Sequence, residues 1–451
     1  MDVDLLVRVL HRRAQLARHD RWTPTELAAH QAAALAGLRR HASSRSQFYS
    51  AYRAGLEGAS LQELPTVTKA QLIEGFDRVV TARGLTLAGI DEHLRLLTES
   101  DGDPGQPFRG RWWVAATAGT TGRRGVFVWD RREWSTVLAS YARATQWAGV
   151  RVDLRRPLRT AVVSSRIPTH QSAVVGASLR SHAVPTLRLD ARTPVSEVVA
   201  RLNDFAPRVL VGYASTLRPL AAEQLAGRLH INPEAVMSAS EVLTSPAANE
   251  MERAWGSRPF DVYAATETAG IASPCPLGNR HLYEDLVIAE PVTDDGTPAD
   301  PGAAGSRLLV TVLFSRTIPL IRYELSDRVT LNTSGCACGL PFRVLERVEG
   351  RQQDVLNVPG VDGRVLVHPI VFHAVLDEAD ASQWQVVDEG TTLRVLVVPR
   401  RVAFDTERLR DDLAKSLSDA GAMIGVQVEV VSEIHRTPLG KTPLIRRAED
   451  T

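Results

Sequence analysis

The sequence predicts an α/β protein with a large N-terminal body of layered sheets and helices and a small C-terminal α+β lid domain. Between Thr160 and Leu313, short apolar runs alternate with helical patterns, which is typical of a domain with a largely parallel sheet. Beyond Glu349 the pattern changes to a hairpin, one helix and a further strand. We therefore expect a large body at 1–349, a hinge at 350–354 and a mobile lid at 355–451.

The N-terminal part of the body is expected to be helical. Residues up to about 80 are rich in Ala, Leu and Arg, with few helix breakers before Gly55. From Trp112 to Trp129, two short apolar runs flank a loop rich in Gly and Thr. Asp130 then has the chemistry of a helix N-cap, and Glu133 stands where the second residue of a capping box belongs.

The C-terminal part has its own signals. The runs Gln383–Val387 and Leu393–Val398 predict a hairpin, because the turn-like sequence Asp-Glu-Gly separates them. Asp405 should cap a helix whose leucines recur every four residues, and Gly421 should end that helix. Val426–Val431 alternates like a final strand.

Composition excludes several classes of protein. The 451 residues carry a formal net charge of +1, which gives no general reason to expect nucleic acid or an anionic membrane as a partner. No run of 18 apolar residues occurs, and the N-terminus lacks the pattern of a secretory signal. Three cysteines fit a reducing compartment, so we expect a cytoplasmic protein.

The loop between the two apolar runs has the composition of a phosphate-binding turn. Gly119 and Gly122 let the backbone approach a phosphate, and Thr117, Thr120 and Thr121 supply hydroxyl donors. A second strand follows in place of the helix of a Walker A loop. Taken alone, the loop is equally consistent with a plain hairpin turn.

Four further polar residues could act on a nucleotide. Glu267, beside the hydroxyl of Thr266, suits magnesium shared with substrate phosphates, although a solvated carboxylate is the commoner reason for such a residue. Asp327 could accept hydrogen bonds from a ribose or could simply cap a turn. Lys441 is one of three lysines in a chain whose other basic residues are arginines, and Arg351 lies at the domain junction.

In this order, these segments resemble the core motifs of the adenylate-forming superfamily of acyl-CoA synthetases, peptide-synthetase adenylation domains and luciferases. The closest resemblance is to the phenylacetate–CoA ligase branch, through the segment Leu64-Pro-Thr-Val-Thr-Lys69 and the Cys-x-Cys-Gly segment before the hinge. The resemblance implies an AMP-forming ligase that uses ATP and magnesium to activate a carboxylic acid as acyl-AMP. It further implies transfer of the acyl group to a thiol, most simply coenzyme A.

The resemblance also implies a role for each residue. Lys441 would enter with the lid and bridge the carboxylate and the α-phosphate, to which Thr266 would donate, while Glu267 would hold magnesium. The lid would then rotate to admit the thiol. The remaining nucleotide contacts would come from Thr117, Gly119, Thr120, Thr121, Gly122 and Arg123 at the phosphates, and from Asp327 and Arg351 near the ribose.

The acyl pocket is expected to draw on Tyr213, Ser240, Glu241, Ala264 and Ala265. Small side chains at positions 264 and 265 leave room for a ring and so favour an aromatic acid. Other readings of the same chemistry stay open: the acyl-AMP could go to an amine, a carrier protein or another nucleophile. A nucleotide-binding pseudoenzyme is the alternative from a different class, and the identity of the acid and the oligomeric state are not readable from the sequence.

The chain departs from the family at three places that matter for these alternatives. Arg123 and Arg124 stand where the phosphate loop usually carries a lysine, and Ala264 replaces a usual glycine. At the junction, Gln353 stands where an aspartate is usual. This last change bears on the thioester step more than on adenylation.

The three cysteines predict a second kind of site. Cys275, Cys336 and Cys338, together with His281, offer three thiolates and one imidazole, which is a closed tetrahedral set of the kind that binds structural zinc. Three buried free cysteines are the alternative.

Overall fold

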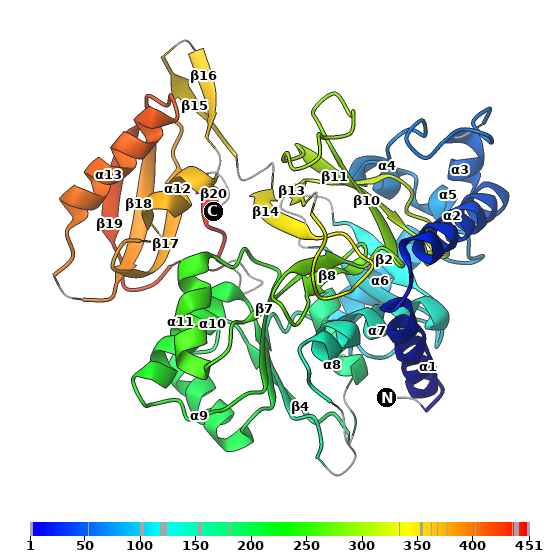
Figure 1. Cartoon of the computed structure of the whole chain (residues 1–451), viewed down its shortest axis with the longest axis horizontal. Helices are drawn as coiled ribbons and strands as arrows, with labels where there is room; N and C mark the ends of the chain where they lie inside the picture. Colours follow the sequence, from blue (N-terminus) through cyan, green and yellow to red (C-terminus); the bar gives the residue numbers. More distant parts are fainter. Residues whose placement is uncertain are drawn as a thin grey trace.

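The computed structural model describes residues 3–52, 54–99, 103–117, 124–151, 156–179, 181, 183–332, 334–351, 355–361, 363–367, 369–376, 378–401, 403–434, 436 and 442–448. It has the α/β architecture that the sequence predicts, with a large body of sheets and helices and a C-terminal domain of sheet and helices (Figure 1). No described helix is both long and apolar enough to cross a membrane.

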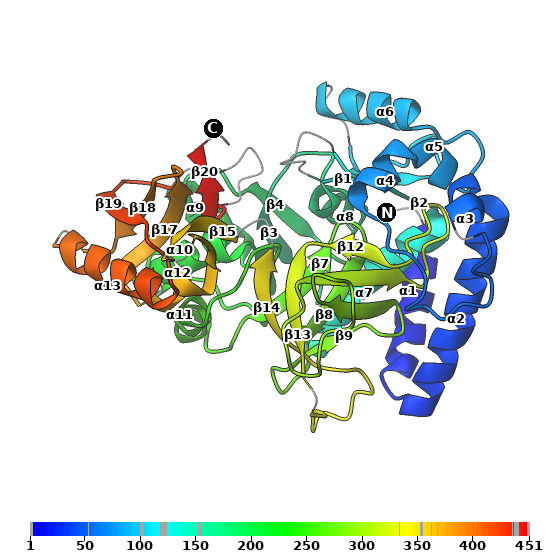
Figure 2. The ribbon, with the colours of Figure 1, turned by 90° about the horizontal axis from the view of Figure 1, so that it is seen from above.

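Helices form the N-terminal part of the body. Thr23 and Glu26 make a capping box at the start of the second of them, with Pro24 in its first turn, where the missing N–H costs no hydrogen bond. Figure 2 shows this helical layer at the end of the body remote from the C-terminal domain. The helices are α1 (Val3–His19), α2 (Pro24–Arg45), α3 (Gln47–Tyr52), α4 (Lys69–Glu74), α5 (Phe76–Val79) and α6 (Leu87–Glu99).

A short hairpin and a long helix follow. Strands β1 (Trp113–Ala116) and β2 (Val126–Trp129) pair antiparallel, and all their residues are buried. Helix α7 (Arg131–Trp147) begins with the capping box that the sequence predicts, because Asp130 accepts from the backbone N–H of Glu133 at 2.8 Å and Glu133 accepts from that of Asp130 at 2.7 Å.

A seven-stranded sheet forms the centre of the body. Its strands run in the order β4-β3-β5-β6-β7-β8-β9, and the first five are parallel. From β8 on, the strands are antiparallel, because connections of a few residues cannot form parallel crossovers. The strands are β3 (Thr160–Ser164), β4 (Thr186–Asp190), β5 (Val209–Gly212), β6 (Ala235–Ala239), β7 (Phe260–Ala265), β8 (Ala269–Pro274) and β9 (Arg280–Leu282).

The two faces of this sheet differ. Alternate residues such as Ala161, Leu210 and Val236 are buried against helices α9 (Val195–Phe205), α10 (Ala214–Leu225) and α11 (Ser245–Trp255). The residues between them point toward α7 and helix α8 (Gln171–Leu179), where Val162 and Val211 are only half buried although they lie in central strands. This second face therefore borders a cavity.

Two small sheets complete the body. One contains β10 (Val287–Val292), β11 (Arg307–Val312) and β12 (Tyr323–Leu325), and the other pairs β13 (Asp327–Leu331) with β14 (Leu345–Arg351). Strand β14 includes Arg351, so residues 350 and 351 of the predicted hinge lie in a strand, while residues 352–354 lie outside the described residues. The exact domain boundaries stay a prediction.

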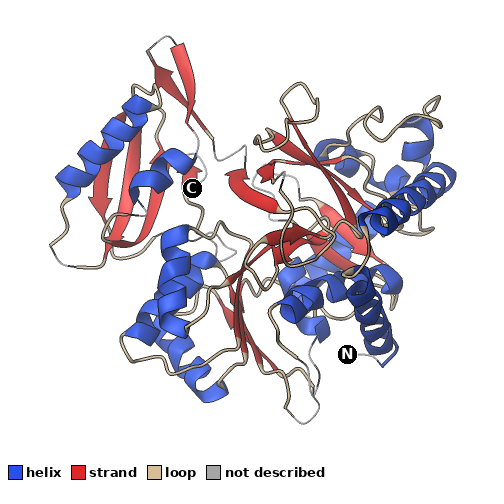
Figure 3. Cartoon of the chain, in the orientation of Figure 1, coloured by secondary structure: helices blue, strands red, loops and turns tan. Residues whose placement is uncertain are grey.

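The C-terminal domain has a hydrophobic core of its own, centred on residues such as Phe372, Trp384 and Leu413. Its four-stranded sheet has the order β19-β18-β17-β20, with the predicted hairpin in the middle, and Asp405 caps the following helix as expected (Figure 3). Gly421, at φ +80°, follows the end of that helix. The elements are β15 (Leu356–Gly360), β16 (Gly363–Val367), α12 (Pro369–Leu376), β17 (Ala381–Asp388), β18 (Thr392–Pro399), α13 (Thr406–Asp419), β19 (Gly425–Val430) and β20 (Ile445–Arg447).

Candidate active site

A cavity of about 2160 Å³ lies between the body and the C-terminal domain. Residues of both parts line it, among them Thr442 and Trp384 from the C-terminal domain. It brings together residues that the sequence scatters over more than 200 positions. The predicted site residues that line it are Thr117, Tyr213, Ser240, Glu241, Ala264, Ala265, Thr266, Glu267 and Asp327.

Some predicted residues cannot be compared with this geometry. Gly119, Thr120, Thr121, Gly122 and Arg123 lie outside the described residues, as does Lys441. Arg351 is the last residue of β14, and its backbone stands opposite Asp327 in the β13–β14 pair. For these residues the proposed roles stay predictions.

The end of β7 carries the group of polar residues predicted for the nucleotide. Tyr263 donates from its hydroxyl to Asp327 Oδ2 at 3.0 Å, which links β7 to the start of β13. Burial, and then the carboxylate of Glu267, raise the pKa of Tyr323 well above its usual value. A phenol that keeps its proton can donate a hydrogen bond to Glu267.

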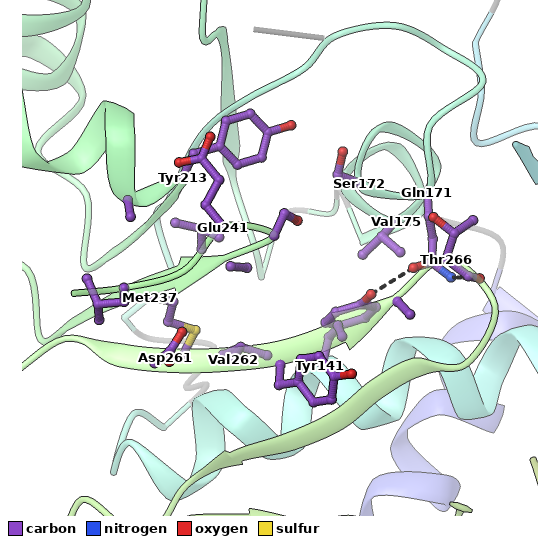
Figure 4. Close-up of a pocket in the computed structure, with 18 of the residues that line it drawn as sticks. Tyr141, Gln171, Ser172, Val175, Tyr213, Met237, Glu241, Asp261, Val262 and Thr266 are labelled. Carbon is purple, nitrogen blue, oxygen red and sulfur yellow. Dashed lines mark hydrogen bonds between the residues drawn. The ribbon is translucent and has the colours of Figure 1, made fainter. Parts of the chain in front are cut away.

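Gln171, the first residue of α8, is a site residue that the sequence did not reveal. Its amide nitrogen donates to the carbonyl oxygen of Thr266 at 3.0 Å, and its amide oxygen accepts from the Tyr141 hydroxyl at 2.8 Å (Figure 4). The backbone at Thr266 is thereby held from α7 through α8. A lone Gln after a short loop gives no sequence signal for this role.

Glu241 joins the body to the C-terminal segment. It accepts from the backbone N–H and hydroxyl of Ser215 at 2.9 and 3.0 Å, and from the backbone N–H of Thr442 at 3.3 Å. Thr442 directly follows Lys441 in the sequence, so the residue next to the predicted catalytic lysine lies inside the cavity. Ser240 has a φ of +68°, and such strain is stored mainly at functional positions.

Tyr213 lies at the end of β5, on the cavity side. Burial raises the pKa of its hydroxyl to about 12, so the group is neutral near pH 7 and can accept a hydrogen bond from the backbone N–H of Ser165 at 3.0 Å. Tyr213 is thus a fixed wall of the cavity.

Lys69 is the second residue that sequence reasoning left out of the site. It lines the cavity, and its Cε lies 3.0 Å from the position that a Cβ on Gly125 would take. Gly125 closes the base of the predicted phosphate loop, because its N–H donates to the Thr117 hydroxyl at 2.9 Å. Arg322, buried at φ +51°, donates to the carbonyl oxygens of Gln62 and Leu64 and so holds the segment that carries Lys69. The scarcity of lysine was the available signal.

The four predicted zinc ligands lie together at a separate place in the body. Their ligand atoms all lie within 4.8 Å of one another, with Cys275 Sγ 3.9 Å from Cys336 Sγ and Cys338 Sγ 3.3 Å from His281 Nε2. Two sulfurs bound to one tetrahedral zinc at about 2.3 Å each would be ~3.8 Å apart. The other ring nitrogen of His281 bonds to the carbonyl oxygen of Phe342 at 2.7 Å, which turns Nε2 toward the sulfurs. The donor set therefore fits a zinc ion.

Two curated proteins are similar to this chain in sequence, whereas no protein-family model matches it. The phenylacetate–coenzyme A ligase of Thermus thermophilus is 23% identical over 347 residues, which are 75% of this chain and 74% of that protein. Protein CapK of Staphylococcus aureus is 22% identical over 313 residues, 66% of this chain and 60% of that protein.

The fold is shared with solved structures of 2-hydroxyisobutyryl-CoA ligase. The structure in the postadenylation state, in complex with R3-HIB-AMP, superposes with a TM-score of 0.75 at 17% identity, covering 96% of this chain and 92% of that chain. The structure of the same ligase in the thioesterification state gives a TM-score of only 0.59 over the same shares of the two chains. The present arrangement of body and C-terminal domain thus resembles the postadenylation state more. The chain is thus similar in sequence to a phenylacetate–coenzyme A ligase and shares the fold of 2-hydroxyisobutyryl-CoA ligase.

Proposed function

We propose that this chain is an AMP-forming acid–thiol ligase. It activates a carboxylic acid as acyl-AMP with release of pyrophosphate, and then transfers the acyl group to coenzyme A. The observation that carries this proposal is the contact of Thr442 with Glu241, because it brings the neighbour of Lys441 into the cavity that also contains Thr266, Glu267 and Asp327. The similarity to the ligase of Thermus thermophilus supports it.

In this proposal the body binds ATP and the C-terminal domain supplies the cation. Asp327, which Tyr263 holds at 3.0 Å, accepts from the ribose, and the 117–123 loop with Lys69 neutralises the phosphates. Lys441 approaches the α-phosphate, where negative charge accumulates as the carboxylate attacks. Magnesium held by Glu267 would supply further charge to the phosphates. The predicted division into a body, a hinge at 350–354 and a lid is part of this proposal.

The acid is proposed to have a large apolar acyl group, with aromatic acids included. Along the α7-facing side of the sheet, the cavity runs from Tyr213 at the end of β5 back to Val209. Four residue steps at about 3.3 Å each give a depth of ~13 Å. Side chains in neighbouring registers form this wall: Thr160, Val162, Val209, Val211, Met237, Ala239 and Val262.

The opposite wall is equally apolar over most of its length. It consists of Tyr141, Ala142, Ala144 and Thr145 from α7 and Val175 from α8. Figure 4 shows Tyr141, Val175, Met237 and Val262 among the residues that line the pocket. Each methylene buried in such a groove contributes about 0.8 kcal/mol. Affinity should therefore rise with the length of the acyl group until the groove is filled.

The test is exchange of pyrophosphate into ATP with a series of straight-chain and arylalkanoic acids. We expect the best activity with long or extended aromatic acids, and we expect Val211→Trp to shift the optimum to shorter ones. Lys441→Ala should lower exchange about 10²- to 10³-fold, the usual effect of removing a group that stabilises transition-state charge. Lys415→Ala, on the exposed face of α13, is the matched control and should not change the rate.

Several outcomes would contradict the proposal. Exchange with no acid would favour a nucleotide-binding pseudoenzyme, and exchange that survives Lys441→Ala would remove the predicted catalytic lysine. Product mass analysis with coenzyme A, amines and carrier proteins distinguishes the acceptors. An acyl-AMP that reacts with an amine or carrier protein but not with coenzyme A would correct the second half of the proposal.

We also propose that Cys275, His281, Cys336 and Cys338 bind one structural zinc ion, which would join the β8–β9 hairpin to the loop before β14. The closed set of four ligands leaves no position for a substrate. Metal analysis of the purified protein should find about one equivalent of zinc, and Cys338→Ser should lower both the zinc content and the melting temperature. Less than half an equivalent would reject the site.

A further inference from the structure

An arginine of the C-terminal domain forms a paired contact with a carboxylate of the body. Arg400, directly after β18, donates from Nη1 and Nη2 to the two carboxylate oxygens of Glu250 on α11, at 2.8 and 2.7 Å. Its Nε donates to the carbonyl oxygen of Ala381 in its own domain at 3.3 Å. The guanidinium is thus held by the C-terminal domain through Nε and presents its two terminal nitrogens to the body.

The body holds the Glu250 carboxylate in place for this contact. Its side chain is only 5% exposed, and Arg218 on α10 donates to Glu250 Oε2 at 3.0 Å. Burial alone would raise the pKa of Glu250, but hydrogen bonds from Arg400 and Arg218 outweigh it and hold the pKa below its usual value. The carboxylate is therefore ionised at neutral pH. Neither Arg400 nor Glu250 is among the residues that line the cavity, so neither touches substrate there.

The pair is suited to a domain orientation that the protein adopts for one step and then leaves. A paired Arg–carboxylate contact fixes direction as well as distance, so it holds one domain arrangement and few others. Arg400 keeps 28% of its side chain exposed, so water can replace its bonds when the domains separate. The arrangement in which the pair forms is the one closer to the postadenylation structure of 2-hydroxyisobutyryl-CoA ligase than to its thioesterification structure.

We propose that Arg400 and Glu250 are a positioning pair that holds the C-terminal domain over the cavity for acyl-AMP formation and separates before thioester formation. This inference rests on the proposed ligase function. Arg400 acts through the orientation of its domain, and hence through the placement of Lys441. The consequence is that loss of Arg400 should slow acyl-AMP formation without slowing thioester formation.

The experiment measures the two half-reactions separately. ATP–pyrophosphate exchange with an active acid reports adenylation, and thioester formation from chemically prepared acyl-AMP and coenzyme A reports the second step. Arg400→Ala should lower the exchange rate about tenfold, a typical size for coupling between two states, and should leave the second step equal or faster. Arg400→Lys should restore part of the exchange activity, because a lysine can reach Glu250 with one donor only.

Arg401→Ala is the matched control, because Arg401 carries the same charge one residue further on, with 81% of its side chain exposed. It should leave both rates unchanged. Equal losses in both half-reactions, an unchanged exchange rate in Arg400→Ala, or the same effect in Arg401→Ala would each overturn the positioning role. Absence of exchange in the unsubstituted protein would instead contradict the proposed function itself.

Discussion

Two arginine–carboxylate pairs in this protein have nearly the same geometry and very different surroundings. Arg143 on α7 contacts Asp285 with two bonds of 2.8 Å, and Arg400 contacts Glu250 with bonds of 2.8 and 2.7 Å. The side chains of the first pair are 1% and 0% exposed, and those of the second are 28% and 5% exposed. Burial, and not bond geometry, therefore distinguishes the two pairs.

The surroundings explain what each pair can do. Asp285 also bonds to His19 Nδ1 at 2.7 Å, and Arg143 lies against the ring of Tyr283, so the first pair joins α1, α7 and the sheet within one core. The second pair joins two separate cores. Breaking the first leaves a charge stranded in the interior, whereas breaking the second exposes its arginine to water. One contact is permanent and the other reversible.

The largest effect is expected from Asp285→Asn. Burial alone would raise the pKa of Asp285, but the charge of Arg143 and its hydrogen bonds hold it far below the usual value. Loss of the carboxylate charge leaves the buried Arg143 with only its longer ion pair to Asp20, at 3.3 Å. Removing one partner of a buried pair typically costs ~3–5 kcal/mol of unfolding free energy. Denaturant unfolding of the body measures this loss. The exposed Asp4, which pairs with Arg8, provides the control, and a similar loss in Asp4→Asn would show that burial is not the cause.

A smaller effect is expected from Glu250→Gln, which imitates protonation of the second pair. Because the pKa of Glu250 is lowered, its contribution is present at neutral pH and lost as the pH falls through the acid range. A neutral amide keeps one acceptor, and bonds to charged groups are roughly twice as strong as neutral ones, so we expect about a threefold loss of exchange activity. A loss larger than that of Arg400→Ala would indicate that Glu250 mainly holds α10 and α11 together through Arg218.

The smallest effect is expected from salt. At 1 M ionic strength the screening length falls to about 3 Å, which weakens partly exposed pairs and leaves buried ones almost unchanged. Exchange activity should therefore fall by less than about threefold between 0.1 and 1 M sodium chloride, and Arg400→Ala should lose that dependence. An identical salt response in Arg400→Ala would show that the salt dependence does not come from this pair.

The local signals in the sequence identified much of this fold. The capping box at Asp130 and the hairpin around Gly390 depend on neighbouring residues, so local patterns suffice to place them. The antiparallel continuation after β7 was not foreseen, because buried strands have similar apolar runs in both kinds of sheet.

The candidate site was predictable to a similar degree. Predicted site residues such as Glu241 and Asp327 line one cavity, while their roles stay predictions. Gln171 was missed because its position depends on the packing of α8. Lys69 was missed because its position depends on the hydrogen bonds from Arg322 to the 62–67 segment. The Arg400–Glu250 pair joins residues 150 positions apart, and a charged residue near a strand end has no signal for such a partner.

The separate core of the C-terminal domain has a consequence for how such proteins can be recombined. The described residues that form the groove between the sheet and α7 belong to the first part of the chain. The second part contacts the body through polar bonds such as Arg400–Glu250 and Thr442–Glu241. A chimera that takes its second part from a relative should therefore keep the acid preference of the first. The rate of acyl-AMP formation in such a chimera would depend on whether the transplanted domain still presents an arginine to Glu250.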